Sequence, residues 1–144
     1  MIIASNESST TKTDVRSADY SLVADTTPPR GTGSGFRPHE LLEAALASCM
    51  AITLRLAAQE RGIQLEHVSV RIELDRTVAS RAMFRSHIEF DEGVSEKHRR
   101  LLTEVARLCP VRKTLSKSID FDESAVGSPT PSPDFVKKAD GLKE

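Results

Sequence analysis

The longest regular pattern of apolar residues in the chain follows a helical spacing between about Pro38 and Arg61. Residues at three- and four-residue steps share one face of a helix. A set of apolar side chains has this spacing here: Leu42, Ala45, Leu46, Cys49, Ile52 and Leu56. Gly62 follows directly and is a typical residue for ending a helix. The pattern therefore predicts one long helix that carries the sulfur of Cys49 on its apolar face, buried or nearly so.

Strict alternation of apolar and polar residues marks two segments after this helix. The first is HVSVRIELD, and the second covers residues 84–90, beyond the turn-like stretch RTVASRA. Such alternation is typical of strands with one buried face, so we expect the two segments to pair as antiparallel neighbours.

Residues 1–27 alternate more weakly and end in DYSLVADTT, where Tyr20, Leu22 and Ala24 share one face. This pattern predicts a β-hairpin at the start of the chain. The following PPRGTGSGFRP has prolines and glycines at the density of a loop. Its GTGSG lacks the lysine and following Ser or Thr of a phosphate-binding loop, so we interpret it as a flexible connection.

Helical spacing returns after the break at DEGVS. Ser95 can cap a helix that runs to about Leu108 and has a stripe of apolar residues: Leu101, Leu102, Val105 and Leu108. Pro110 ends this helix and begins another short one. SIDFDE, residues 118–123, predicts a last strand. Residues 124–144 are rich in Pro, Ser, Lys and Asp, so we expect one domain over residues 1–123 and a disordered or loosely docked tail.

The charge balance argues against a polyanionic partner. The 144-residue chain has 20 Lys and Arg residues interspersed with 21 Asp and Glu residues, and its net charge is −1. We therefore expect neither nucleic acid nor an acidic membrane as a partner. No apolar run resembles a signal peptide or a membrane span, which favours the cytoplasm.

Cys49 and Cys109 are the residues most suited to chemistry. In a reducing cytoplasm, two cysteines this far apart in sequence are reactive or simply buried more often than they form a permanent disulfide. One thiol within a helix and one at a helix start fit a peroxide-reacting cysteine and its resolving partner. Because Cys109 precedes Pro110, we expect the N–H groups of the helix start to lower the pKa of Cys109.

Other chemical motifs are weak. The histidines show no metal-ligand spacing, so we expect no metal site: His39, His67, His87 and His98. No flavin, haem or nicotinamide motif occurs either. Any redox reaction would therefore draw its electrons from a partner.

PHELLEAALASC, followed by two strands, a further helix and CPVRKTL, resembles the OsmC/Ohr family of organic hydroperoxide reductases. The resemblance covers roughly Val15 to Phe121. It implies an α+β fold in which antiparallel sheets pack on two long central helices of an intertwined homodimer. It also implies that Cys49 reduces an organic hydroperoxide, becomes a sulfenic acid and forms a disulfide with Cys109. The family's reductant is a lipoyl-type or other small dithiol.

A thiol on an apolar face needs a nearby cation to react as a thiolate. In the family this cation is an arginine just before an N-terminal strand, and Arg16 is the best match. Arg30 and Arg37 are alternatives because they lie in the loop before the long helix.

One position departs from the family pattern. The family places a glutamate ten residues before the peroxidatic cysteine, where this chain has His39, and the nearest carboxylate is that of Glu40. At about 100° per residue, position 39 lies about 80° around a helix from Cys49 and position 40 about 180°. Glu40 therefore points away from Cys49 in a regular helix, and we expect slower peroxide reduction than in specialised family members.

Two functions fit the sequence. The first is a thiol peroxidase, and the apolar surroundings of Cys49 favour peroxides that carry a hydrocarbon group. The second is a non-peroxidatic, small-molecule-binding or stress-related protein that keeps the fold and an interfacial apolar pocket.

Overall fold

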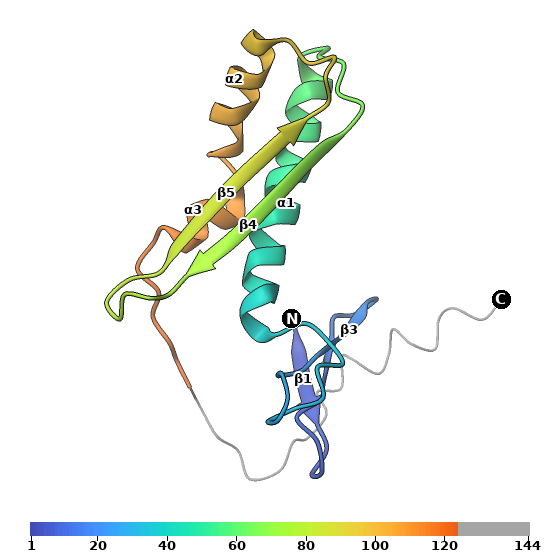
Figure 1. Ribbon diagram of the computed structural model, residues 1–144, viewed down its shortest axis with the longest axis vertical. Coiled ribbons are helices and arrows are strands. Elements are labelled where there is room, and N and C mark those ends of the chain that lie inside the picture. Colours follow the sequence, from blue (N-terminus) through green and yellow to red (C-terminus); the bar gives the residue numbers. More distant parts are fainter. Residues whose placement is uncertain (124–144) are drawn as a thin grey trace, which may run out of the picture. The chain divides into compact units, whose positions relative to one another are not determined.

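The computed structural model describes residues 1–123 of the chain, and they form two compact units (Figure 1). The first unit comprises residues 1–38 and the described residues after 119, and the second comprises residues 39–119. The predicted tail, residues 124–144, lies outside the described residues.

The first unit contains a three-stranded antiparallel sheet rather than a simple hairpin. Its strands are β1 (Ile3–Asn6), β2 (Thr13–Arg16) and β3 (Ser21–Ala24), in the order β1-β2-β3. Leu22 and Ala24 are two residues apart in β3 and so share a face, but Tyr20 lies outside the strand, and only Ala24 is buried whereas Leu22 and Tyr20 are exposed. Strands of four residues are too short for alternation alone to define a buried face.

A buried carboxylate organises the loop after β3. Asp25 is only 3% exposed and accepts hydrogen bonds from the hydroxyls of Thr11 and Thr32, each at 2.7 Å. The backbone N–H groups of Thr26, Thr32 and Ser34 also donate to it. These bonds, led by those from the two threonine hydroxyls, hold the pKa of Asp25 well below its ordinary value. The loop is thus tied to one carboxylate, unlike the flexible connection that its composition predicts.

The second unit joins one β-hairpin to three helices. Strands β4 (Val68–Asp75) and β5 (Met83–Phe90) pair antiparallel from Val68↔Phe90 to Asp75↔Met83, as the alternation predicts. The helices are α1 (Pro38–Glu60), α2 (Glu96–Ala106) and α3 (Pro110–Leu115). Apolar side chains of both strands pack against the core that α1 and α2 supply, and the hairpin crosses α1 in Figure 1.

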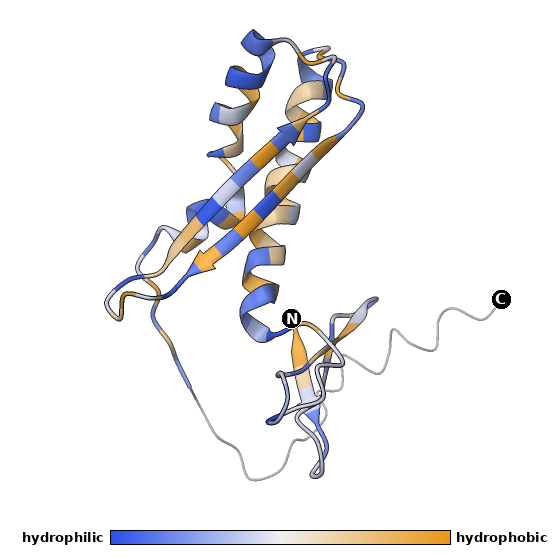
Figure 2. Cartoon of the chain, viewed as in Figure 1, coloured by the Kyte–Doolittle hydropathy of each residue, from blue (hydrophilic) through white to orange (hydrophobic). Residues whose placement is uncertain are grey.

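The long helix α1 has two apolar faces, and much of its ribbon is pale orange in Figure 2. One face is buried in the core: Leu46, Met50, Leu54, Ala57 and Ala58. The other face, which we call the outer stripe, is exposed: Leu42, Ala45, Ile52 and Leu56. At 100° per residue the two faces lie about 130° apart. The predicted helix is confirmed. Of the residues expected on its buried face, however, only Leu46 is buried and Cys49 is half-buried, and the other four form the exposed outer stripe.

Two apolar faces make α1 unusually hydrophobic. By its length and composition alone, it could cross a membrane. The expectation that the chain contains no such stretch is therefore wrong. A core helix of a soluble protein passes the same test, and one face of α1 does build the core of the second unit.

The C-terminal elements follow the predicted order with two corrections. Ser95 caps α2 by accepting the His98 N–H at 3.3 Å, and the short helix α3 begins at Pro110. On α2, however, the core contains Leu102 and Ala106, whereas the expected stripe residues Leu101 and Leu108 are exposed.

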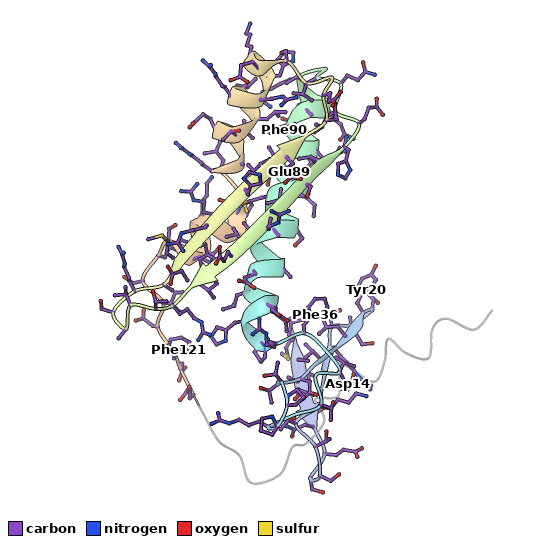
Figure 3. All side chains as sticks on the ribbon, viewed as in Figure 1. Asp14, Tyr20, Phe36, Glu89, Phe90 and Phe121 are labelled. Carbon is purple, nitrogen blue, oxygen red and sulfur yellow. The ribbon has the colours of Figure 1, made fainter. Side chains whose placement is uncertain are left out.

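The predicted last strand, residues 118–123, is not formed. A strand needs a neighbouring strand to take its backbone hydrogen bonds, and the described part of the chain supplies none to this segment. Ile119 is consequently exposed, and so is Phe121, which is labelled in Figure 3.

Candidate active site

Cys49 occupies the middle of α1, close to the outer stripe. Its side chain is half-buried and packs against the core of the second unit. Leu46 and Met50 flank it on the buried side, and Ile52 follows one turn later in the outer stripe. The position gives the thiol both a fixed backbone and access from outside the core.

Cys109 lies at the start of α3 and is 0% exposed. It is the residue before the helix, with Pro110 at the first helical position, but its side chain makes no capping hydrogen bond. The turn between α2 and α3 directs the sulfur into the core, where it forms a side-chain hydrogen bond with Cys49. The structure therefore brings together two thiols that are 60 positions apart (109 − 49), and both are free.

The surroundings of Cys109 raise its pKa. Burial is the largest cause, followed by the hydrogen bond with Cys49, and negative charge on Cys49 acts in the same direction. The backbone N–H groups of Arg112 and Val111 oppose this shift without overcoming it. The prediction of a lowered pKa is therefore wrong, because desolvation in the core outweighs the start of a helix only six residues long.

This asymmetry gives the two thiols different chemical capacities. Cys109 is kept protonated and can donate its S–H to the sulfur of Cys49. Since Cys109 is inaccessible, an incoming electrophile meets Cys49 first.

The candidate cations belong to the first unit, and the thiols belong to the second. Arg16 is exposed at the end of β2, where its Nε donates to Asp14 Oδ2 at 2.6 Å. Arg30 and Arg37 are also exposed, and Arg37 directly precedes α1.

The two acidic residues in the N-terminal part of α1 do not contribute to the cysteine site as predicted. The helix is regular from Pro38, so Glu40 lies about 180° around it from Cys49, and the two are not brought together. Sequence reasoning did not foresee the contact of Glu43, whose Oε1 accepts the backbone N–H of Leu74 at 2.6 Å and ties α1 to β4. A carboxylate on the same helical face as Leu46 and Met50 is the signal that could have identified it.

A shallow open groove runs along the outer stripe. It has a volume of about 330 Å³ and is lined by Ala51, Ile52, Arg55, Leu56 and Val68. Among residues 1–123, no three His, Cys, Asp or Glu side chains converge in a way that could hold a metal ion.

Residues 31–124 match the model of a family described as OsmC-like protein. The chain belongs to the OsmC-like family. Its α+β fold is the OsmC-like fold, as solved structures show. An OsmC-like protein from Mycoplasma pneumoniae is 25% identical, with a TM-score of 0.66 and coverage of 80% of this chain and 85% of that one.

Two further structures of this fold carry functional descriptions. An organic hydroperoxide resistance protein OsmC from Legionella pneumophila is 22% identical (TM-score 0.58), with coverage of 81% of this chain and 89% of that one. The organic hydroperoxide resistance protein OhrB of Bacillus subtilis is 16% identical (TM-score 0.60), with coverage of 83% and 92%. No protein of curated function matches the chain.

Proposed function

We propose that the protein is a thiol-dependent peroxidase that reduces organic hydroperoxides. The observation that carries this proposal is the hydrogen-bonded pair of a half-buried Cys49 and a fully buried, protonated Cys109. Membership of the OsmC-like family supports the proposal. So do the two structural neighbours of this chain that are described as organic hydroperoxide resistance proteins.

The reaction begins at the sulfur of Cys49. Its thiolate attacks one peroxide oxygen and the O–O bond breaks, which leaves a sulfenic acid on Cys49 and an alkoxide that takes a proton to become an alcohol. The Cys109 sulfur then loses its proton and attacks the sulfenic sulfur, a disulfide forms, and the displaced hydroxyl takes up a proton and leaves as water. A dithiol, which we propose to be small or lipoyl-type, returns two electrons and two protons and is itself oxidised.

A cation is required to stabilise the thiolate and the departing oxygen, and we assign this role to Arg16. Its guanidinium is permanently charged and has several donors in a planar fork. Arg30 and Arg37 remain the alternatives. Glu40 was a candidate for orienting the cation, but its position opposite Cys49 on α1 gives it no direct role there.

The apolar surroundings of Cys49 favour a hydroperoxide with a hydrocarbon group over hydrogen peroxide. The neighbouring groove presents Ile52, Leu56 and Val68, and contact with these side chains removes apolar surface from water. We place the reaction in the cytoplasm, where dithiol reductants are maintained.

Consumption of cumene hydroperoxide by the full chain with a dithiol reductant tests the proposal. Cys49→Ser should abolish consumption, whereas Cys109→Ser should form one sulfenic acid per chain and then stall, because the resolving thiol is missing. Mass spectrometry distinguishes the sulfenic acid from a Cys49–Cys109 disulfide. Continued turnover by Cys49→Ser, or a wild-type chain that never forms the disulfide, would exclude this mechanism.

The second candidate is a non-peroxidatic small-molecule-binding or stress-related protein. The open groove of about 330 Å³ beside the outer stripe favours it, since apolar residues provide most of its lining. This function does not require oxidation of Cys49. A Cys49→Ser chain that binds an apolar ligand normally, together with a wild-type chain inert to peroxide, would select it.

A further inference from the structure

Asp14 and Arg16 share one face of β2. Residues two apart in a strand point to the same side of the sheet, so the long Arg16 side chain folds back along the strand to reach the shorter Asp14. Its Nε and Nη2 both donate to the same oxygen, Asp14 Oδ2. Two donors on one acceptor fix the plane of the guanidinium as well as its distance.

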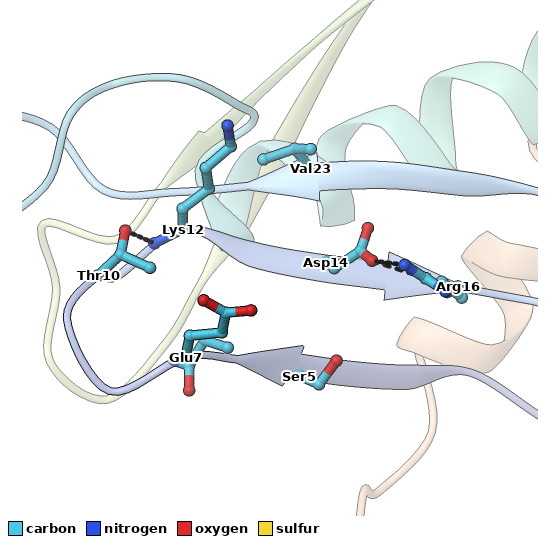
Figure 4. Close-up of a pocket in the computed structure, with 8 residues that line it drawn as sticks. Ser5, Glu7, Thr10, Lys12, Asp14, Arg16 and Val23 are labelled. Carbon is cyan, nitrogen blue, oxygen red and sulfur yellow. Dashed lines mark hydrogen bonds and ion pairs between the residues drawn. The ribbon is translucent and has the colours of Figure 1, made fainter.

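This arrangement leaves the other side of the guanidinium unused. Arg16 has no partner besides Asp14 within residues 1–123, so both N–H groups of Nη1 and the second of Nη2 are available. The guanidinium lies over the centre of the sheet, where Ser5 and Val23 are the cross-strand neighbours of Asp14. Arg16 and Asp14 line an open pocket of about 500 Å³, and Figure 4 draws the residues of this lining.

An unrestrained arginine is a poor ligand for one small oxygen anion. Its side chain has several rotatable bonds, and ordering them costs conformational entropy each time the anion is bound. A carboxylate that holds the guanidinium in advance removes part of this cost and selects which donors face outward. The negative charge of Asp14 also weakens the positive potential of Arg16, so the two effects oppose one another.

We propose that Asp14 is a positioning residue for peroxide reduction, because it holds the Arg16 guanidinium with Nη1 free to bind an oxygen of the hydroperoxide. This inference rests on the proposed function, in which Arg16 is the cation. Asp14 acts through Arg16 and does not touch the substrate. The benefit of holding the Arg16 guanidinium in place outweighs the reduction of its positive potential by Asp14. Removal of the Asp14 carboxylate therefore slows the reaction.

The test is the second-order rate of Cys49 oxidation by cumene hydroperoxide, measured by stopped flow on the full chain. Asp14→Asn keeps the shape and removes the charge, and the rate should fall about fivefold. Asp14→Glu should recover most of the loss, because a carboxylate can again reach the guanidinium. Asp19→Asn is the matched control, since it removes an exposed acidic residue of the same unit, whereas the hydrogen bonds and ion pair of Arg16 go to Asp14, and it should leave the rate unchanged.

A double-mutant cycle tests whether Asp14 works through Arg16. In an Arg16→Ala background, Asp14→Asn should produce no further loss. An equal loss in both backgrounds, or an Asp14→Asn rate equal to wild type, would overturn the positioning role while leaving the peroxidase intact. An Arg16→Ala rate equal to wild type would do the same. A wild-type chain without any reaction would instead reject the proposed function and, with it, this inference.

Discussion

Two thiols of the same chemistry acquire different properties from where the fold places them. Cys49 sits on a helix face that is only half-covered, whereas Cys109 is enclosed at the α2–α3 turn. Desolvation disfavours the charged form of a buried thiol, and the S–H of Cys109 gains a hydrogen-bond partner in Cys49. The residue that must react last is therefore also the one held protonated.

Replacement of Cys49 by alanine should lower the pKa of Cys109. The hydrogen bond and the charge of Cys49 both raise that pKa, so their removal shifts it down, although burial keeps it above its ordinary value. The pH dependence of Cys109 alkylation in Cys49→Ala, compared with Cys109 in the wild-type chain, measures the shift. Ala51→Ser, which alters α1 without touching the pair, should show the wild-type profile. Identical profiles for Cys49→Ala and wild type would mean that the thiols do not interact.

The sequence identified both thiols but could not provide their environment. The positions of Cys49 in a helix and Cys109 before Pro110 follow from local pattern. The pKa of Cys109 depends on core packing between elements far apart in the chain, and a local rule about helix starts predicted the wrong direction. The contacts of Asp25 and Glu43 escaped prediction for the same reason, because their partners lie elsewhere in sequence.

At the scale of elements, α1 shows why the spacing of apolar residues predicts the presence of a helix more reliably than it predicts which face of the helix is buried. Apolar residues recur on two faces about 130° apart, so periodicity fixes the helix but not which face enters the core. The missing strand at residues 118–123 is a related case. Its alternation is genuine, but a strand exists only where another strand accepts its hydrogen bonds.

The buried face of α1 should dominate the stability of the second unit. Leu54 is fully buried, so Leu54→Ala removes apolar contacts and leaves a cavity, which should lower the free energy of unfolding by about 3 kcal/mol. Chemical denaturation measures this loss. Gln59→Ala, on an exposed position of the same helix, should change stability by less than about 0.5 kcal/mol. Equal effects of the two substitutions would contradict the assignment of the core face.

At the scale of the whole molecule, the outer stripe is the feature that a single chain leaves unexplained. Ile52 is 60% exposed and Leu56 is 53% exposed, on a helix of 23 residues that is about 35 Å long. Large apolar side chains exposed in a continuous row are typical of interfaces between proteins. With Cys49 between Ala45 and Ile52, the stripe residues follow one another at steps of three and four, the spacing of a helix that packs along a second helix. We therefore propose a homodimer in which the stripes of two chains meet.

Light scattering should accordingly give about twice the chain mass of 15.8 kDa. Ile52→Glu should shift the protein toward the monomer, because a buried carboxylate in the stripe has no partner charge. Ala44→Glu adds the same charge at an exposed position of α1 that lies at least about 80° around the helix from every stripe residue, and it should leave the dimer unchanged. Thermal stability of the wild type should also rise with protein concentration, since association stabilises the folded chain. Because Cys49 adjoins the stripe, Ile52→Glu should slow peroxide reduction as it dissociates the dimer. A monomeric wild-type protein at micromolar concentration that still turns over peroxide would show that one chain contains the complete site.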